Sequence, residues 1–189
     1  MQEEIDSKEM LRQLLHIFFG SVFIASVVLF GMSATLYFLI AIFLIGAVIS
    51  FLIMKGSNVP IFSQIVETIG RGSEKELPGQ GALFFFLGAI ILMALFNEQH
   101  IVVGALIVSV YGDGFSTIIG KTFGRKKLPN NKTLEGSMAG IIVSALLLGL
   151  LFPPHAAIAT AVIGMLAELL PIDDNLTIPV VSAVVLKFF

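Results

Sequence analysis

Long runs of apolar residues constrain this chain more than any other feature. Residues 11–30 contain a single Lys or Arg and residues 34–54 contain none. Each run has about the 20 residues that a helix needs to cross the hydrocarbon core of a bilayer. Hydrophobic residues make up 57% of the 189 positions and charged residues only 13%, which is unlike a soluble domain. We therefore predict an all-α integral membrane protein with one transmembrane domain at 1–189.

Seven membrane-spanning segments are predicted from the apolar runs and from the breaks between them. They lie at about 11–30, 34–54, 81–96, 100–119, 135–152, 155–170 and 175–189. The last segment is short and contains Pro179, so it is expected to be tilted or partly re-entrant.

Basic residues indicate which side of the membrane each loop faces. With seven spans, ten of the eleven Lys and Arg residues fall on one side and only Lys187 falls on the other. Because positively charged loops stay in the cytoplasm, we predict a cytoplasmic N-terminus, linker (55–80), basic loop (120–134) and turn (171–174). The chain is then a multi-pass protein of the cell membrane whose polar site faces the cytoplasm.

The linker at 55–80 carries apolar residues at close to helical spacing. Two interpretations stay open: an amphipathic helix that lies on the cytoplasmic leaflet, or a gate for a lipid substrate. The chain has no cysteine, which excludes disulfides and a thiol nucleophile. Its formal net charge of −2 argues against nucleic acid as a partner.

Four carboxylates lie where a membrane helix rarely tolerates charge. Asp113 and Glu168 each follow, by thirteen residues, a histidine at the start of their predicted span. At ~1.5 Å per residue both acids lie about 20 Å from the outer surface, and Asp173 and Asp174 reach a similar depth. Magnesium usually takes one or two carboxylates together with phosphate oxygens and water. The sequence therefore predicts a site for a hard cation near the cytoplasmic face.

Each of these acids also has a structural explanation. Asp113 could be the counter-ion of Lys121 or Arg125, and Glu168 could be hydrogen-bonded within the bundle. The two acids of the 171–174 turn could be solvated and cap the last helix.

Small residues and positive charges follow Asp113. Thr117, Gly120 and Gly124 share one helix face with it, which allows close approach of another helix or of a phosphate. The basic residues of this region are Lys121, Arg125, Lys126, Lys127 and Lys132. They could bind a triphosphate while the carboxylates hold its metal. Alternatively, they are ordinary positive-inside charge with an affinity for anionic lipid; a Walker A loop is absent.

Helix-end signals accompany the loop. Thr133 is predicted to cap the next helix, and Glu135 would lie in its first turn, where the helix dipole favours an acid. Gly136 keeps the helix start slim, so its N–H groups could bind an anion. Arg12 and His16 lie one turn apart in the first span. They could meet a phosphate or the acids, or they could be an interfacial Arg beside a packed His.

Three separated motifs carry a family resemblance. The first is Asp113, Thr117, Gly120 and Gly124; the second is Lys132, Thr133, Glu135, Gly136 and Ser137; the third is Glu168, Leu169, Pro171, Asp173, Asp174, Asn175, Thr177 and Pro179. In this order they resemble the CTP-dependent polyprenol kinases, which include dolichol kinase and the phytol and farnesol kinases. Arg12, His16 and the stretch 74–82 also resemble the shorter members of that family. The resemblance covers most of the chain and is shared with a diacylglycerol kinase and the phosphatidate cytidylyltransferases.

The resemblance implies a membrane kinase that uses Mg²⁺ and transfers the γ-phosphoryl group of CTP to a long isoprenoid alcohol, leaving CDP. The alcohol would be a polyprenol, dolichol, phytol or geranylgeraniol, with its chain in the bilayer. Catalytic roles then fall to Asp113, Glu168 and Lys132; one of the acids, with Glu168 as a candidate, would accept the alcohol proton. The metal ligands are expected to be Asp113, Asp173 and Asp174. The expected nucleotide-binding residues are Gly120, Lys121, Gly124, Arg125, Lys126, Lys132, Thr133, Glu135, Gly136 and Asn175.

Other activities fit the same residues. A cytidylyltransferase acting on a lipid phosphate, or a diacylglycerol kinase, would use the same nucleotide and metal. A small transporter whose acids bind a cation is a non-enzymatic alternative. The choice of CTP rests on the resemblance alone.

Overall fold

The computed structural model describes residues 7–57, 59–60, 62 and 77–189. The regular secondary structure of this part is helical, and one isolated bridge joins Lys127 and Thr133. The long helices are α1 (Ser7–Met54), α3 (Gln80–Leu95), α4 (Gln99–Ile107), α5 (Asp113–Phe123), α6 (Leu134–Leu148), α7 (Pro154–Leu166) and α8 (Asp174–Leu186). Three short turns join them: the π-helical turn η2 (Val108–Gly112) and the 3₁₀ turns η3 (Pro129–Asn131) and η4 (Ala167–Leu169). The predicted all-α class is confirmed.

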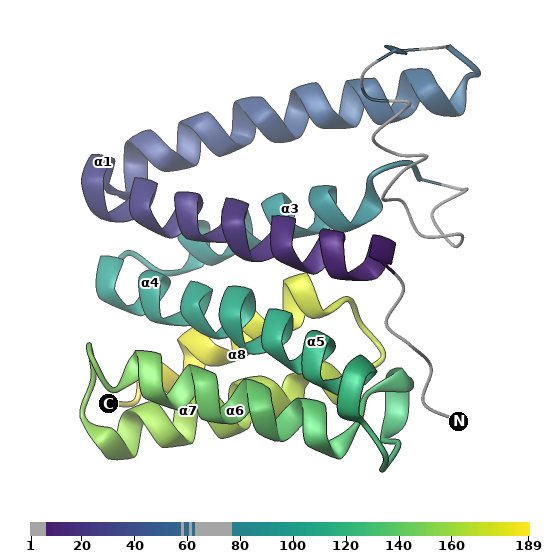
Figure 1. Cartoon of the computed structure of the whole chain (residues 1–189). Helices are drawn as coiled ribbons and strands as arrows, with labels where there is room; N and C mark the ends of the chain where they lie inside the picture. The colour runs from purple at the N-terminus through teal and green to yellow at the C-terminus, as the bar shows by residue number, and fades with distance from the viewer. Residues whose placement is uncertain (1–6, 58, 61, 63–76) are drawn as a thin grey trace.

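The element α1 consists of two helices that meet at Gly31. This residue has φ 80° and ψ 167°, which are not helical, and Figure 1 shows the purple and blue arms of α1 running in opposite directions. A side chain at Gly31 would meet nothing within 4 Å, so glycine is needed for the positive φ rather than for space. The turn predicted at 31–33 is therefore present.

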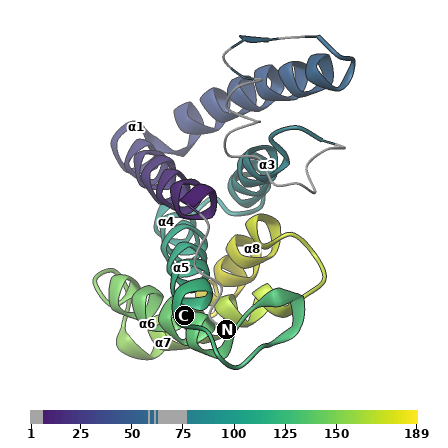
Figure 2. The same ribbon diagram turned by 45° about the vertical axis from the view of Figure 1, so that its right-hand side comes forward.

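One continuous helix forms the centre of the bundle. The elements α4, η2 and α5 join into a helix of 25 residues, Gln99–Phe123, whose most apolar stretch is 72% buried, against 11% for that of α1. The helices α1, α3, α6, α7 and α8 all pack on it, and Figure 2 shows α4 and α5 as a column between them. The helix extends four residues beyond the predicted end at 119.

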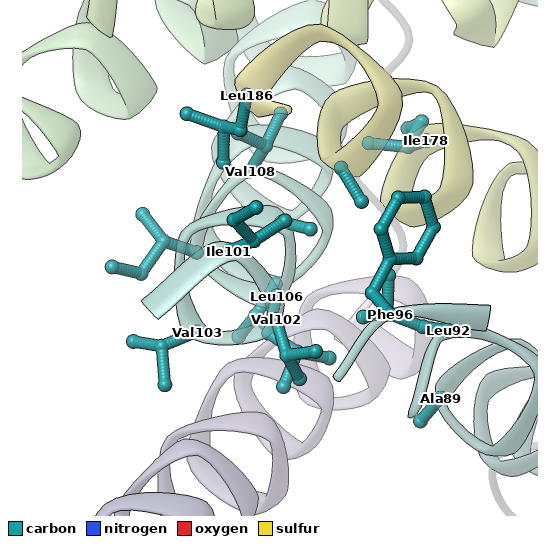
Figure 3. Packing of buried hydrophobic residues seen from close by; sticks show 14 of the residues in the cluster. Ala89, Leu92, Phe96, Ile101, Val102, Val103, Leu106, Val108, Ile178 and Leu186 are labelled. Carbon is teal, nitrogen blue, oxygen red and sulfur yellow. The ribbon is translucent and has the colours of Figure 1, made fainter. Parts of the chain in front are cut away.

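The apolar core lies where this central helix meets α3 and α8. Figure 3 shows Leu92 of α3 and Phe96, which directly follows α3, beside Leu106 of α4, with Ile178 and Leu186 of α8 on the neighbouring side. All five side chains are buried. The packing fixes the register of α8 and therefore the position of the acids at its N-terminus.

Large apolar side chains cover the outside of the bundle, which supports association with a membrane. Leu29, Phe30, Tyr37 and Leu150 are each more than 70% exposed. Within the part of the chain that the structure describes, two helices, Ser7–Met54 and Gln99–Phe123, are long and apolar enough to cross a bilayer, and four further apolar helices are shorter. The count of seven spans stays a prediction. The linker helix predicted within 55–80 falls largely outside the described residues.

The helix ends that carry polar residues come together. The start of α1, the end of α5 and the start of α6 lie at the same end of the bundle, on the right in Figure 1. The loop 124–133 joins this end through its backbone bonds to Glu135 at the start of α6. Glu168 of η4 is bonded to α5 and α6, and Asp174 at the start of α8 pairs with the loop residue Lys132. The rest of the bundle is predominantly apolar.

Candidate functional site

The ammonium group of Lys132 lies among three carboxylates. Its Nζ is 2.6 Å from Asp174 Oδ2, 3.1 Å from Asp113 Oδ1 and 3.3 Å from Glu168 Oε2. These acids come from the starts of α5 and α8 and from η4. The Lys132 side chain is 14% exposed and that of Glu168 is fully buried. Residues 61 positions apart along the chain therefore meet at one cation.

The surrounding acids keep Lys132 charged. Burial alone lowers the pKa of an ammonium group, but the carboxylates of Asp113, Asp174 and Glu168 outweigh it and raise the pKa of Lys132 above its ordinary value. For Asp174, which precedes the last predicted span, the surroundings disfavour the charged form. Burial and the Asp113 carboxylate raise its pKa to about 6, although Lys132 acts to lower it. Three carboxylates around one ammonium leave the cluster short of positive charge.

Glu168 lies behind the cluster, and both of its oxygens are bonded. Ser116 Oγ donates to Oε2 at 3.0 Å, and Ser137 Oγ donates to Oε1 in a short bond. With the Lys132 contact, Glu168 accepts from three side chains on three separate segments. Glu168 thus joins α5, α6 and the basic loop. Its contacts fit the alternative stated above, in which this acid is hydrogen-bonded within the bundle.

A polar cavity of about 390 Å³ opens beside the cluster. It is lined by Asp113, Ser116, Thr117, Gly120, Lys121, Asn130, Asn131, Lys132, Thr133, Asp173, Asp174 and Asn175. Glu168 is not among the lining residues. Of the five basic residues predicted to meet phosphates or lipid, only Lys121 and Lys132 line the cavity, whereas Arg125 and Lys126 are exposed elsewhere.

The basic loop is folded by its own backbone and by Glu135. Glu135 Oε2 accepts from the backbone N–H groups of Arg125, at 2.9 Å, and Lys126, at 3.2 Å. Two further backbone bonds, Leu134 N to Lys126 O (2.9 Å) and Leu128 N to Lys132 O (2.8 Å), close the loop. The nucleotide role predicted for Glu135 is untested, and in this structure the side chain shapes the loop.

Asn130 fastens this loop to the turn between α7 and α8. Its Nδ2 donates to Leu170 O at 2.7 Å and lies 3.4 Å from Glu168 O. Asn130 and Asn131 both have φ 56°, in the left-handed region that asparagine tolerates better than most residues. Sequence reasoning did not identify either residue. The Pro-Asn-Asn run, typical of a turn, is the signal that could have found them.

Helix caps account for two of the predicted site residues. Thr133 Oγ1 accepts from Gly136 N at 3.2 Å and caps α6, as predicted. Asp173 Oδ1 accepts from both the backbone N–H and the side-chain Nδ2 of Asn175, each at 3.0 Å, and caps α8. Asp173 and Asn175 also line the cavity, where their side chains are bonded to each other.

The predicted glycine positions lie at a close crossing of α5 and α6. A Cβ atom on Gly136 would lie 2.5 Å from Ser116 O and 2.9 Å from Gly120 Cα. A Cβ on Gly124 would lie 2.1 Å from Gly120 O. Of the two predicted uses of these small residues, the helix packing is present. Gly120 also lines the cavity.

A second polar cluster joins the start of α1 to the end of α5. Glu9, which is 7% exposed, pairs with Lys121 Nζ at 3.0 Å and with Arg12, and it accepts from Gln13 Nε2 at 3.2 Å. His16 packs edge-on against Phe85, with ring centroids 5.2 Å apart. Its Nε2 also lies 3.4 Å from the backbone oxygen of Ser109 on the central helix. The interpretation of a packed His fits this geometry.

Two of the acids have the chemistry to hold a metal that arrives with phosphate. Among the described residues no group of three or more His, Asp or Glu side chains is placed to hold a metal. Asp113 and Asp174 both line the cavity and point to one centre, and one or two carboxylates with phosphate oxygens are the usual setting for magnesium. These two residues fit such an ion; the assignment of Asp113, Asp173 and Asp174 as its ligands stays a prediction.

Comparison with known proteins gives relatives over most of the chain. An uncharacterized protein of Methanocaldococcus jannaschii is 31% identical over 95% of this chain and 93% of its own length. The probable chloroplastic phytol kinase of Triticum aestivum is 26% identical over 97% of this chain and 68% of its own. The CTP-dependent diacylglycerol kinase 1 of Schizosaccharomyces pombe is 29% identical over 67% of each.

The chain therefore spans about two thirds of the length of the latter two relatives. No family model matches the chain. No solved structure matches it either.

Proposed function

Because the chain belongs to the family of CTP-dependent polyprenol and lipid kinases, we propose that it phosphorylates a long isoprenoid alcohol. The γ-phosphoryl group of CTP would pass to the hydroxyl of a polyprenol, dolichol, phytol or geranylgeraniol, giving a lipid phosphate and CDP. The site would face the cytoplasm of a multi-pass cell-membrane protein. The placement of Lys and Arg relative to the seven predicted spans supports that orientation.

One observation carries the proposal: acids and a charged lysine share the wall of one polar cavity at the end of an apolar bundle. Asp113, Asp174, Lys121 and Lys132 line it together. Phosphoryl transfer requires alignment and neutralisation of charge on the phosphates and little covalent chemistry from the protein. A cavity with both signs of charge is suited to this, because cations bind phosphate oxygens and carboxylates bind the accompanying metal.

The role that each residue would have follows from whether its side chain lines the cavity or lies behind it. Asp113 and Asp174 would hold magnesium together with phosphate oxygens, and Lys121 and Lys132 would bind the phosphates directly. Bound magnesium would supply positive charge that neutralises the transferring phosphoryl group. Glu168 would act from behind the cavity by holding Lys132.

The alcohol proton needs an acceptor that reaches the cavity. Glu168, a candidate for this role from the sequence, is fully buried, bonded at both oxygens and absent from the cavity wall. We therefore assign the proton to the pair Asp113 and Asp174, which do line it. In protein kinases, too, an aspartate near the acceptor hydroxyl accepts its proton.

Transfer of label tests the activity. Membranes that carry the protein are incubated with an isoprenoid alcohol and CTP labelled at either the α or the γ phosphate. A kinase moves the γ label into lipid and releases CDP, whereas a cytidylyltransferase acting on a lipid phosphate moves the α label and releases pyrophosphate. Asp113→Asn serves as the inactive control.

The acceptor and the nucleotide are resolved in the same assay. A panel of farnesol, phytol, geranylgeraniol, a dolichol and diacylglycerol is tested with each nucleoside triphosphate. Preference for diacylglycerol, the substrate named for the Schizosaccharomyces pombe relative, would replace the isoprenoid assignment. Absence of either label from lipid, with cation flux in sealed vesicles that Asp113→Asn abolishes, would replace the kinase by a transporter.

A further inference from the structure

Lys132 occupies the centre of the acids that a metal would need. Its ammonium lies within 3.3 Å of oxygens from Asp113, Asp174 and Glu168. Two of these three acids line the cavity. The same oxygens cannot serve both cations in this arrangement, because magnesium binds carboxylate oxygens at about 2.0–2.1 Å. An ammonium so close to them would repel the metal.

The ammonium can leave this position without unfolding the loop. Lysine carries its charge on a flexible four-carbon stem, and Lys132 itself lines the cavity. The backbone on either side is fixed independently by the Leu128–Lys132 and Leu134–Lys126 bonds. A triphosphate in the cavity would give the ammonium a second set of anionic oxygens.

We propose that Lys132 is a resident counter-cation that keeps Asp113 and Asp174 from binding a divalent metal until a nucleotide arrives. The nucleotide phosphates draw the ammonium away, and the two carboxylates then take the metal that the nucleotide carries. Metal binding is thereby conditional on nucleotide. This inference rests on the proposed function, because it requires that the cavity binds a triphosphate.

The contacts of the two lysines in the cavity indicate that Lys132 acts on the acids directly, and not merely as one of several positive charges near them. Lys121 also lines the cavity, but its ammonium pairs with Glu9, 3.0 Å away on α1. The two lysines thus place the same charge on the same cavity wall, and only Lys132 contacts the acids of the candidate metal site. This difference supplies a matched control.

Direct binding of Mn²⁺, followed by electron paramagnetic resonance of the free ion, tests the proposal in the purified full chain. The wild-type protein is expected to bind Mn²⁺ weakly alone and more tightly with a β,γ-imido analogue of CTP, by about the 5–150-fold typical of coupled sites. Lys132→Met should bind Mn²⁺ alone at least about fivefold more tightly than the wild type. In the absence of nucleotide, Lys132→Arg should still bind Mn²⁺ weakly, and Lys121→Met should bind Mn²⁺ as weakly as the wild type does.

A second measurement covers the case in which Lys132→Met folds poorly. Mn²⁺ without nucleotide should raise the thermal midpoint of Lys132→Met and restore its elution as a single species, because a ligand of the folded state stabilises it. The same ion should leave the wild-type midpoint unchanged. Asp174→Asn added to Lys132→Met should remove the gained Mn²⁺ binding.

Three results would overturn the inference: tight Mn²⁺ binding by the nucleotide-free wild type, no gain in Lys132→Met by either measurement, or an equal gain in Lys121→Met. The last result would assign the effect to the general charge of the cavity. None of these readouts depends on turnover. A kinase assay without label in lipid would instead reject the proposed function, while the Mn²⁺ comparison would still report on Lys132.

Discussion

Gly136→Ala would separate the two uses predicted for the glycine at the start of α6. The added Cβ would lie 2.5 Å from Ser116 O and 2.9 Å from Gly120 Cα, both backbone atoms of α5. Neither atom can rotate away, as the end of a flexible side chain would. Moving the closest contact from 2.5 Å to an ordinary 3.4 Å displaces the two helices by about 1 Å.

That displacement is expected to reduce turnover more than nucleotide binding. Forcing extra volume into a packed contact costs about 1–3 kcal/mol, which lowers the thermal midpoint. The helix α5 carries Asp113, and Lys132 lies just before α6. A misplacement of about 1 Å between catalytic groups can cost roughly 100-fold in rate, so kcat should fall by about that factor.

Initial rates of γ-label transfer at varied CTP concentration, together with thermal unfolding followed by gel filtration, measure both effects. Gly149→Ala is the matched control, since it lies at the other end of α6 with a right-handed φ of −62° and its Cβ would be 3.2 Å from the nearest atom. It should leave kcat and the midpoint unchanged. A normal kcat and midpoint in Gly136→Ala, with only a raised KM for CTP, would refute the packing explanation and favour close approach of a phosphate.

Three further substitutions test the rest of the site. Asn130→Gly keeps the left-handed backbone but loses the bonds to the α7–α8 turn. Because a hydrogen bond contributes about 0.5–1.5 kcal/mol, kcat/KM should fall by up to about tenfold. An equal loss in the neighbouring Asn131→Gly would contradict the proposal that Asn130 holds the loop to this turn. Glu168→Gln removes one charged partner of Lys132, an interaction that contributes about 1.5–3 kcal/mol. We therefore expect a lower thermal midpoint and a reduced kcat, with an unchanged dependence of kcat on pH. Loss of one limb of that pH profile would show that Glu168 is the proton acceptor after all. Arg125→Ala should change the KM for CTP by no more than about twofold relative to the wild type. The Arg125 side chain is exposed and does not line the cavity, and substitutions at such surface positions usually have small effects. A large rise in KM would place Arg125 in the nucleotide site.

The depth of the acids could be derived from the sequence because a helix rises by a fixed amount per residue. Asp113 and Glu168 were each counted from the start of their own segment, and the structure joins both to one ammonium. The cap at Thr133 followed from residue type and position alone. Where periodicity and a local hydrogen bond decide the outcome, the sequence is sufficient.

The partner of the acids could not be derived in this way. The alternative interpretation of Asp113 as a counter-ion named Lys121 or Arg125 as its partner, whereas in the structure Lys132 pairs with Asp113 and Lys121 pairs with Glu9. The choice depends on how the loop 124–133 folds back, which is set by two left-handed asparagines and by Glu135 bonding to backbone. Such long-range contacts carry no periodic signal in a single sequence.

Small and polar residues that the sequence associates with phosphate binding hold helices together in the structure. Helix packing in a membrane explains why residues of these types have this second role. Lipid chains are as apolar as the helices, so the hydrophobic effect does little to join them, and small residues and interhelical polar bonds must do so instead. Gly136 allows α6 to touch α5, and Ser116 and Ser137 tie both helices to Glu168. These contacts fix the distance between Asp113 and the loop that carries Lys132. A substitution in this seam should therefore alter turnover even where no substrate atom touches it.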